Sequence, residues 1–486
     1  MRRVIGRIVT HSRAAVALGT PLLLGLSLTA CDTLNKASDS VFGGGVKPGQ
    51  QGYVSGFIGG TVADEPRAAL LGREILSAGG SAGDAAVGMG LALGVTLPSR
   101  AGLGGGGACI AYAASADSPN KGVPESVLFV PLAPRTGSAG DRPAALPLMA
   151  RGLFALHARY GFLPFETLLA QAENLARGGV PASRALVRDV NAVSGPLFAD
   201  PIARDLFGRG GKTLTEGQRL IQPALAGTLA QLRLAGVGDL YQGAMARRVA
   251  NESAQAGGTL TVEALRGALP GFLPALTVAY GNDRVAFPAP PADGGLAAAA
   301  AFSALVRDPS DLAGASARSL AAAARWRAGG GSPEALIAAT DLPAAGMPSL
   351  PASTSFGAVD RKGNAVMCAA TMGNLFGTGR VLPGLGFLLA ASPAALPPPL
   401  LSVGLAWNPR ENAFHAAAGG SGQAGAPVAV AAGLMNALRT GKPMAVPVPE
   451  PGRANVMSCA GLLPGKESTC ALATDPRESG LAMSGG

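Results

Sequence analysis

The stretch Ser353-Thr354-Ser355-Phe356-Gly357-Ala358-Val359-Asp360 decides the fold of this chain. Its apolar residues are typical of a buried β-strand, and a second strand is expected over residues 365–371. The preceding residues, 310–352, are rich in Ala, Gly, Ser and Pro, so this segment is expected to pack poorly and to be exposed. A hydroxyl side chain therefore stands where an exposed segment is predicted to meet a buried strand.

The chain on either side of this boundary differs in character. Residues 61–351 alternate Ala- and Leu-rich helical patterns with glycine-rich turns, and the clearest helices are expected over residues 146–160, 165–177 and 224–234. From residue 353 onward the sequence reads mainly as strands, which are expected over residues 355–359, 365–371, 386–389 and 414–417. The sequence thus predicts sheets that are covered by helices.

Composition and charge narrow the function classes. Hydrophobic residues make up 48% of the 486 residues and charged residues 14%, which allows a large buried core. Of the formal charge of +9, residues 31–486 carry +5, scattered without interleaved aromatics, so no nucleic acid partner is expected. The glycine run 102–107 leads into a strand rather than a helix, which excludes a phosphate-binding loop. The three histidines are far apart and no Cys/His cluster has metal-binding spacing, so neither a metal nor a cofactor is expected.

Residues 1–30 have the parts of a secretory signal. Four arginines within residues 1–13 precede an apolar run that is interrupted by Pro21 and is short for a membrane-spanning helix. An uncleaved membrane anchor is the alternative. The run ends in Leu28-Thr29-Ala30-Cys31, which resembles a bacterial lipobox and implies a lipid on Cys31, with membrane lipid as a partner. We therefore expect a lipid-anchored protein on the periplasmic side of a bacterial envelope, with residues 31–52 as a flexible tether.

Four further cysteines follow Cys31. Cys109 and Cys368 lie in apolar, strand-like runs and are interpreted as buried packing residues. Cys459 and Cys470 flank a loop that contains Gly and Pro. An oxidising periplasm would permit a disulfide bond between these two, and the sequence leaves that bond open.

A series of short motifs carries a family resemblance. In chain order they are residues 65–86, 98–107, 152–161, 222–226, 241–243, 289–295, 353–366, Phe376-Gly377 and 475–480. Together they resemble the gamma-glutamyltranspeptidase family of N-terminal-nucleophile hydrolases. The resemblance implies an α+β fold, a four-layer αββα sandwich. It also implies one folded domain built from a large-subunit-like segment, residues 53–352, and a small-subunit-like segment, residues 353–486, which stay associated after self-cleavage.

The resemblance also implies how the site works. Such enzymes cut their own chain before a Ser, Thr or Cys, and the freed α-amine, with a pKa near neutrality, is the base for the adjacent hydroxyl. The family nucleophile falls on Ser353, and a shift of one residue would make it Thr354. Thr371 matches a supporting threonine, and Gly419 and Gly420 match the pair whose N–H groups form the oxyanion hole. An ordinary serine in an unprocessed chain is the alternative for Ser353.

Several substrate-binding positions depart from the family. Val130 stands where the family has the arginine that binds the substrate carboxylate, and Gly373 stands where it has an asparagine. The acidic residue expected within residues 388–392 is missing. Valine cannot make the bidentate contact that a guanidinium makes with a carboxylate, so affinity for glutamyl substrates is expected to fall.

Other residues could compensate in part. Of the family's paired serines Ser402 remains, and Ser421, which follows the glycine pair, is a second candidate for substrate binding. Arg100 or Arg135 could replace the missing arginine, although each reads more simply as a surface residue.

Three functions follow from these observations. The first is a gamma-glutamyltransferase or glutathione hydrolase that acts on small amide or peptide substrates. The second is an acylase-like hydrolase that keeps the self-cleaving machinery but accepts a less polar acyl group. The third is a catalytically inactive envelope lipoprotein with the same fold. Thr371 and the glycine pair favour the first two, whereas Val130 disfavours the first.

Overall fold

The computed structural model describes residues 56–115, 118, 120–135, 140–349 and 352–485, all within one unit of the chain, Pro48–Gly486. The expected signal, the lipid-bearing Cys31 and the tether lie outside the described residues. Among the residues described, none of the helices combines the length and the apolar character needed to cross a membrane.

The first of two large sheets brings together strands from both ends of the described chain. Its seven antiparallel strands, in spatial order, are β17 (Leu481–Gly485), β1 (Gly59–Ala63), β11 (Thr354–Asp360), β12 (Ala365–Thr371), β2 (Gly106–Tyr112), β3 (Glu125–Phe129) and β8 (Gly271–Pro274). The strand that we expected over residues 365–371 is β12, with the same bounds.

The second large sheet is also antiparallel. Its six strands, in spatial order, are β16 (Cys470–Ala473), β15 (Arg453–Leu463), β14 (Ala413–Ser421), β13 (Val403–Asn408), β10 (Asp283–Phe287) and β9 (Leu276–Tyr280). Two short two-stranded sheets, among the helices of the first region, pair β4 (Val180–Pro181) with β7 (Arg219–Leu220) and β5 (Gly208–Arg209) with β6 (Lys212–Thr213).

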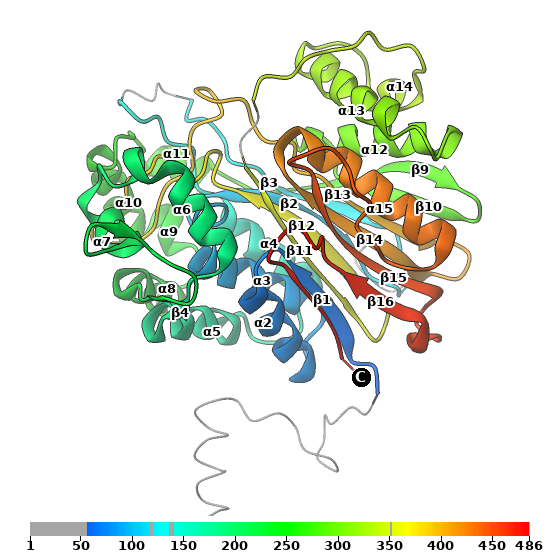
Figure 1. The fold of residues 1–486 in the computed structure, drawn as a ribbon. Coiled ribbons are helices and arrows are strands. Elements are labelled where there is room, and N and C mark those ends of the chain that lie inside the picture. Colours follow the sequence, from blue (N-terminus) through cyan, green and yellow to red (C-terminus); the bar gives the residue numbers. More distant parts are fainter. Residues whose placement is uncertain (1–55, 116–117, 119, 136–139, 350–351, 486) are drawn as a thin grey trace, which may run out of the picture. The chain divides into compact units, whose positions relative to one another are not determined.

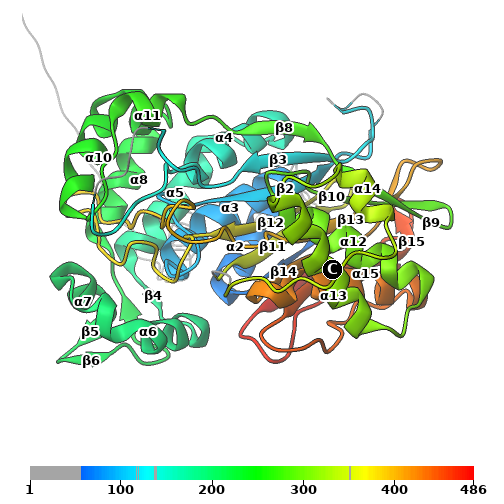
Figure 2. The same ribbon diagram turned by 90° about the horizontal axis from the view of Figure 1, so that it is seen from above.

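Helices cover the outer faces of both large sheets (Figures 1 and 2). On the side of the first sheet are α2 (Pro66–Ser77), α3 (Ala82–Thr96), α4 (Met149–Tyr160), α5 (Phe165–Gly178), α6 (Arg184–Leu197), α7 (Pro201–Phe207), α8 (Pro223–Ala235), α9 (Asp239–Gln242), α10 (Ala244–Gln255) and α11 (Val262–Gly267). On the side of the second sheet are α12 (Asp293–Arg307), α13 (Leu312–Arg327), α14 (Pro333–Ala338) and α15 (Ala426–Thr440).

Residues 310–352 differ from the exposed segment that we expected. They contain α13 and α14, and Ala315 and Ala322 are fully buried. Small side chains let α13 approach α12 closely, so the alanine-rich composition indicates tight helix packing here rather than exposure. The described residues after α14, 339–349, are mainly exposed and lack regular structure.

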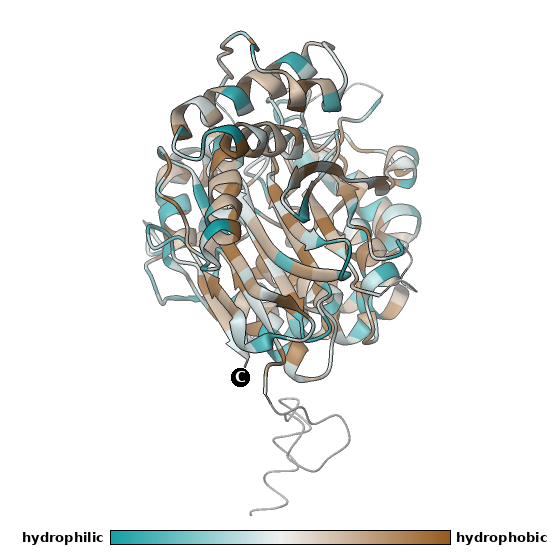
Figure 3. Cartoon of the chain, turned by 90° about the vertical axis from the view of Figure 1, so that its right-hand side faces the viewer, coloured by the Kyte–Doolittle hydropathy of each residue, from teal (hydrophilic) through white to brown (hydrophobic). Residues whose placement is uncertain are grey.

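Three apolar clusters separate the layers. Leu153 and Phe356 belong to the cluster between the helices and the first sheet, Met367 and Leu405 to the one between the sheets, and Phe302 to the one beneath α12. In Figure 3 apolar colours dominate the strands, and hydrophilic residues gather on the outer helices and loops. This arrangement is the αββα sandwich that the resemblance implied, and the prediction is confirmed.

Both pairs of cysteines form disulfide bonds. Cys459 and Cys470 face each other on β15 and β16 and are bonded, as the sequence permitted. Cys109 and Cys368 are also bonded, so their interpretation as unbonded packing residues was wrong. They are fully buried, but they lie directly opposite each other on the neighbouring strands β2 and β12. The disulfide bond between Cys109 and Cys368 joins the large-subunit-like segment to the small-subunit-like one.

Candidate active site

The predicted nucleophile, Ser353, stands immediately before β11 and is only 2% exposed. Strand β11 is held on both sides, by β1 and by β12, and Thr354 lies opposite Ala370 in the register with β12. Gly357 permits the close packing, because a Cβ atom there would lie 2.6 Å from Sδ of Met367. The backbone that leads away from Ser353 is therefore fixed.

Thr371, at the end of β12, contacts the peptide group that self-cleavage would attack. Its hydroxyl donates a hydrogen bond of 2.8 Å to the carbonyl oxygen of Ala352 and accepts one of 2.9 Å from the backbone N–H of Gly373. The second bond orients the hydroxyl so that its proton points at the carbonyl. A donor in this position can stabilise negative charge on that oxygen.

Gly373 has a structural reason to be glycine. Its φ is +75°, and a Cβ atom would lie 2.7 Å from the carbonyl oxygen of Ala391. The family's asparagine could supply a side-chain contact at this position. This chain supplies only the backbone N–H of Gly373, which already donates a hydrogen bond to the Thr371 hydroxyl.

Thr354, the alternative nucleophile, is differently engaged. It is fully buried, and its hydroxyl donates a 3.0 Å hydrogen bond to the carboxylate of Asp64. Thr371 thus contacts the carbonyl before Ser353, while the Thr354 hydroxyl is directed at Asp64. This geometry favours Ser353 over Thr354 as the reacting residue.

The glycine pair lies within β14 rather than in an open turn. The N–H of Gly420 donates 2.9 Å to the carbonyl oxygen of Ser402, so it would have to leave that partner to serve in an oxyanion hole. A Cβ atom on Gly419 would lie 2.9 Å from Cβ of Ser355 on the other sheet. Glycine here lets the two sheets approach each other beside the start of β11.

The two candidate substrate-binding serines are buried. The Ser402 hydroxyl donates to the backbone carbonyl oxygens of Leu400, at 2.9 Å, and Gly294, at 3.2 Å. Ser421 is the last residue of β14 and pairs with Arg453 of β15. The Ser402 hydroxyl therefore holds the backbone before β13.

Apolar residues surround the space beside Thr371. A small cavity touches Thr371 and Gly373, and its other lining residues are Val130, Pro131, Ala391, Pro393, Leu396, Pro397, Pro398 and Pro399. A larger cavity, of about 340 Å³, shares Ala391 and Leu396 with it. Val130, at the position of the family arginine, therefore faces an apolar environment.

Neither arginine that we considered as a replacement is placed beside Val130 in that lining. Arg100 is buried, so its interpretation as a surface residue was wrong, and it forms two 2.7 Å hydrogen bonds with the carboxylate of Asp189 on α6. Ser99 donates to the same carboxylate. Arg135 is exposed. The charge of Arg100 is thus already compensated within the protein.

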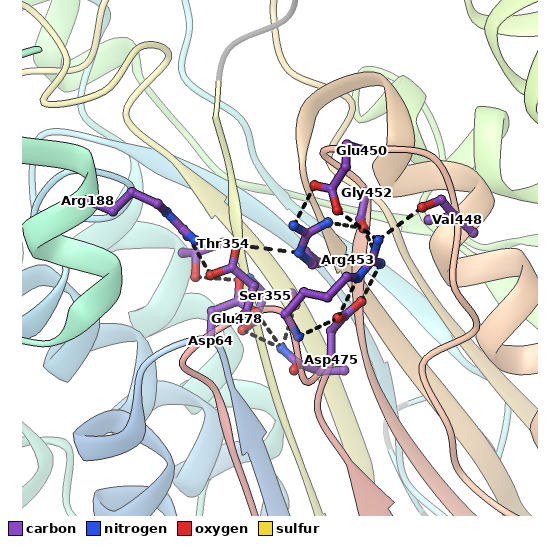
Figure 4. Close-up of polar contacts among 12 residues, drawn as sticks. Asp64, Arg188, Thr354, Ser355, Val448, Glu450, Gly452, Arg453, Asp475 and Glu478 are labelled. Atoms are coloured by element: carbon purple, nitrogen blue, oxygen red, sulfur yellow. Dashed lines mark hydrogen bonds and ion pairs between the residues drawn. The ribbon is translucent and has the colours of Figure 1, made fainter. Parts of the chain in front are cut away.

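Sequence reasoning missed a polar network next to Thr354 (Figure 4). Asp64, which directly follows β1, accepts hydrogen bonds from Thr354, from the N–H of Ser355 at 2.9 Å and from Asn455 of β15 at 2.7 Å. The only signal in the sequence was the position of Asp64 directly before the first family motif.

The carboxyl-terminal motif supplies the rest of this network. Glu478 forms ion pairs with Arg188 of α6 at 2.5 Å and with Arg453 of β15 at 3.8 Å, and Arg477 pairs with Asp475 at 2.7 Å. These contacts hold the segment before β17 against both sheets and α6.

Burial and neighbouring groups both act on the pKa of the Asp64 carboxyl. Burial raises the pKa of the Asp64 carboxyl above its usual value, and the negative charge of Glu478 raises it further. The N–H of Ser355, the charge of Arg100 and the amide of Asn455 act in the opposite direction. Among the residues described, no group of three His, Cys, Asp or Glu side chains is placed to hold a metal ion.

Comparison with known proteins agrees with the fold and with the family resemblance. The family model for gamma-glutamyltranspeptidase matches residues 68–326, more than half of the chain, and the chain belongs to this family. Glutathione hydrolase 3 of Arabidopsis thaliana is 30% identical over 217 residues, covering 43% of this chain and 34% of the relative. Glutathione hydrolase 5 proenzyme of Rattus norvegicus is 32% identical over 244 residues, covering 48% and 43%. The chain thus spans less than half the length of these curated relatives.

Solved structures share the fold over a longer range. The cephalosporin acylase from Bacillus halodurans superposes with a TM-score of 0.71 at 20% identity, covering 90% of this chain and 97% of that one. Helicobacter pylori gamma-glutamyltranspeptidase superposes with a TM-score of 0.50 at 22% identity, covering 58% and 85%.

Arg100→Met tests whether this arginine is structural. We expect the free energy of unfolding to fall by about 3–5 kcal/mol in urea titrations, because Asp189 would stay buried without its cation. Arg100→Met/Asp189→Leu should recover most of the loss, and Arg184→Met, which breaks an exposed pair with Glu216, should cost less than about 1 kcal/mol. Unchanged stability with a raised KM would instead assign Arg100 to substrate binding.

Proposed function

We propose that this protein is a gamma-glutamyltranspeptidase-type amidohydrolase or acyltransferase whose nucleophile, Ser353, is released by cleavage of its own chain after Ala352. The observation that carries the proposal is the hydrogen bond from Thr371 to the Ala352 carbonyl. It places a charge-stabilising donor on the one peptide bond whose scission would turn Ser353 into a chain terminus.

Self-cleavage proceeds by an acyl shift. The Ser353 hydroxyl oxygen attacks the carbonyl carbon of Ala352, and the carbonyl oxygen becomes an oxyanion that Thr371 stabilises. The C–N bond then breaks, the nitrogen takes the proton that the Ser353 hydroxyl has lost, and an ester joins residue 352 to the Ser353 oxygen. Water hydrolyses this ester, which leaves a carboxylate on Ala352 and a free amine and hydroxyl on Ser353.

Turnover uses the two groups that cleavage frees on Ser353, its α-amine and its hydroxyl. The α-amine of Ser353, whose pKa is about 7.7–8.0 in model peptides, takes the hydroxyl proton while the oxygen attacks a substrate amide. The leaving amine takes that proton, and an acyl-enzyme remains. Water then yields the free acid, or an acceptor amine yields a new amide.

A second candidate, an acylase for a less polar acyl group, is favoured by the lining of the cavity beside Thr371. Val130, Ala391 and Leu396 offer no charge to the carboxylate and amine of a glutamyl group. Desolvating those charges without partners would weaken binding strongly, whereas an aliphatic acyl group would gain from burial.

The two fragments would remain joined after cleavage. Cys109 belongs to the first fragment and Cys368 to the second, so their disulfide bond crosses the scission site in sequence. The second disulfide, between Cys459 and Cys470, lies within the second fragment.

We also propose that the protein is exported and anchored by a lipid on Cys31. The arginine-flanked apolar run and the lipobox-like residues 28–31 support this location. Two disulfide bonds among the described residues add support, because such bonds persist in oxidising compartments.

Thr371→Val tests the cleavage step. The valine keeps the shape of threonine but donates no hydrogen bond, so self-cleavage should slow by about 10²–10³-fold on reducing gels. Thr228→Val is the matched control, because Thr228, on α8, is also buried and its hydroxyl donates a 2.8 Å hydrogen bond to the carbonyl oxygen of Leu385. Without reducing agent the cleaved wild type should run as a single band. Cleavage of Thr371→Val at the wild-type rate would contradict the proposed role.

A panel of acyl anilides tests the substrate class. We expect a higher kcat/KM for aliphatic acyl anilides than for the γ-glutamyl anilide, since no charged side chain lines the small cavity beside Thr371. Val130→Arg should shift this ratio toward the glutamyl substrate by about tenfold or more, and Val123→Arg, at a half-exposed position before β3, should not. Faster turnover of the γ-glutamyl anilide by wild type would instead indicate a glutathione hydrolase.

Cys31→Ala tests the anchor. Wild type should sediment with membranes and carry diacylglycerol on the peptide that begins at Cys31, because lipid chains hold a protein at the bilayer. The variant should lose the lipid mass. Sedimentation of both proteins with a full-length amino terminus would indicate an uncleaved membrane anchor instead.

A further inference from the structure

Asp64 is a buried carboxylate that the proposed chemistry does not use. It directly follows β1, its backbone N–H donates a 3.2 Å hydrogen bond to the carbonyl oxygen of Ser355, and its side chain accepts hydrogen bonds from the start of β11. The residue is only 3% exposed. A carboxylate in such a place is costly unless it is well hydrogen-bonded, so its presence at the candidate nucleophile calls for a reason.

The contacts of Asp64 converge on the two residues after Ser353. One carboxylate oxygen accepts from the Thr354 hydroxyl at 3.0 Å and from the Ser355 N–H at 2.9 Å, and the other accepts from Asn455 at 2.7 Å. Asn455 also donates 2.9 Å to the Ser355 hydroxyl. Asp64 and Asn455 thereby join the first sheet to the second beneath the residue that would become the chain terminus.

We propose that Asp64 is a positioning residue for the N-terminal nucleophile, which fixes residues 354 and 355 so that Ser353 meets Thr371 and which places a negative charge one residue from the α-amine of Ser353. The inference rests on the proposed self-cleavage. Before cleavage Asp64 holds the backbone for the acyl shift. After cleavage it keeps a newly made chain end from fraying, as free termini otherwise do.

Two charged groups, Glu478 and Arg100, act on the Asp64 carboxyl, and each is paired with an oppositely charged residue of α6. Glu478 lies on the segment before β17, Arg100 follows α3, Asp189 and Arg188 lie on α6, and Arg453 lies on β15. Glu478 disfavours a charge on Asp64, and Arg100 favours it. Because Arg100 is itself paired with Asp189, and Glu478 with Arg188, the Asp64 carboxylate is the charge whose removal would be felt most directly at the start of β11.

The chain offers a matched control on the same strand. Asp360, at the other end of β11, is also a buried carboxylate whose pKa is raised by burial, and it accepts hydrogen bonds from Asn364, Lys362 and Ala82. Along a strand, six residues separate Thr354 and Asp360 by about 20 Å. Asp360 therefore reports what a buried carboxylate contributes to β11 when it is far from the nucleophile.

The experiment compares three variants of the full chain with wild type. Asp64→Asn removes the charge and sets two amide groups against each other, Asp64→Asn/Asn455→Asp restores an amide facing a carboxylate, and Asp360→Asn is the control. Folding is checked by circular dichroism and gel filtration, cleavage is followed on reducing gels, and kcat/KM for the best anilide is measured against pH.

We expect Asp64→Asn to cleave and turn over at least about tenfold more slowly, because the nucleophile and its base are held less well. The acid limb of its kcat/KM profile should move to lower pH by about one unit, since loss of a nearby negative charge lowers the pKa of an amine. The double variant should recover cleavage to within about threefold of wild type, because the two sites are in contact and coupled. Asp360→Asn should keep the wild-type acid limb.

Each outcome supports or contradicts either the proposed function or the role of Asp64. A wild type that is never cleaved would remove the proposed function itself. A cleaved wild type with an Asp64→Asn variant that matches it in rate and pH profile would overturn the inference alone. If Asp64→Asn is folded but uncleaved, the double variant decides: recovery supports the inference, and a folded double variant that stays uncleaved contradicts it.

Discussion

The register between β11 and β12 is the constraint on which the candidate site depends. With Thr354 opposite Ala370, the next residue of β12, Thr371, comes level with the peptide bond before Ser353, and its hydroxyl reaches the Ala352 carbonyl. A slip of one residue would turn every side chain of β11 to the opposite face of the sheet and take Phe356 out of the core. The packing of the core therefore sets the geometry of the chemistry.

The other edge of β12 is fixed as well, and covalently. The disulfide bond between Cys109 and Cys368 joins β2 to β12 in the middle of the first sheet. In a chain cut before Ser353, this bond would keep the first fragment joined to the second, which carries both Ser353 and Thr371. Gly419 and Gly357, where side chains would not fit, bring the second sheet and β12 close to the same point.

Local patterns in the sequence predicted several individual elements, but the strand expected over residues 386–389 is absent and its residues form only isolated bridges. Strand β12 has the predicted bounds, and the layered architecture follows from the family resemblance. Pairings between distant residues could not be predicted. Cys109 and Cys368 are 259 residues apart, and nothing local indicates that their strands are neighbours. Arg100 read as a surface residue because Asp189, its partner, lies 89 residues away.

The hydroxyls of the site were identified from the sequence, but the groups that orient them were not. Asp64 and Asn455 are 391 residues apart and meet only because β1 and β15 belong to sheets that face each other. The function of a buried polar group depends on its partners, and a single sequence does not specify those partners.

The proposed activity depends on cleavage of the peptide bond between Ala352 and Ser353. Intact-mass spectrometry of the folded, exported protein, after reduction, tests it most directly. We expect two polypeptides, the smaller of which spans residues 353–486 and begins with a free serine amine. A single polypeptide with this peptide bond unbroken would contradict the account and leave a protein that has the family's fold without its nucleophile.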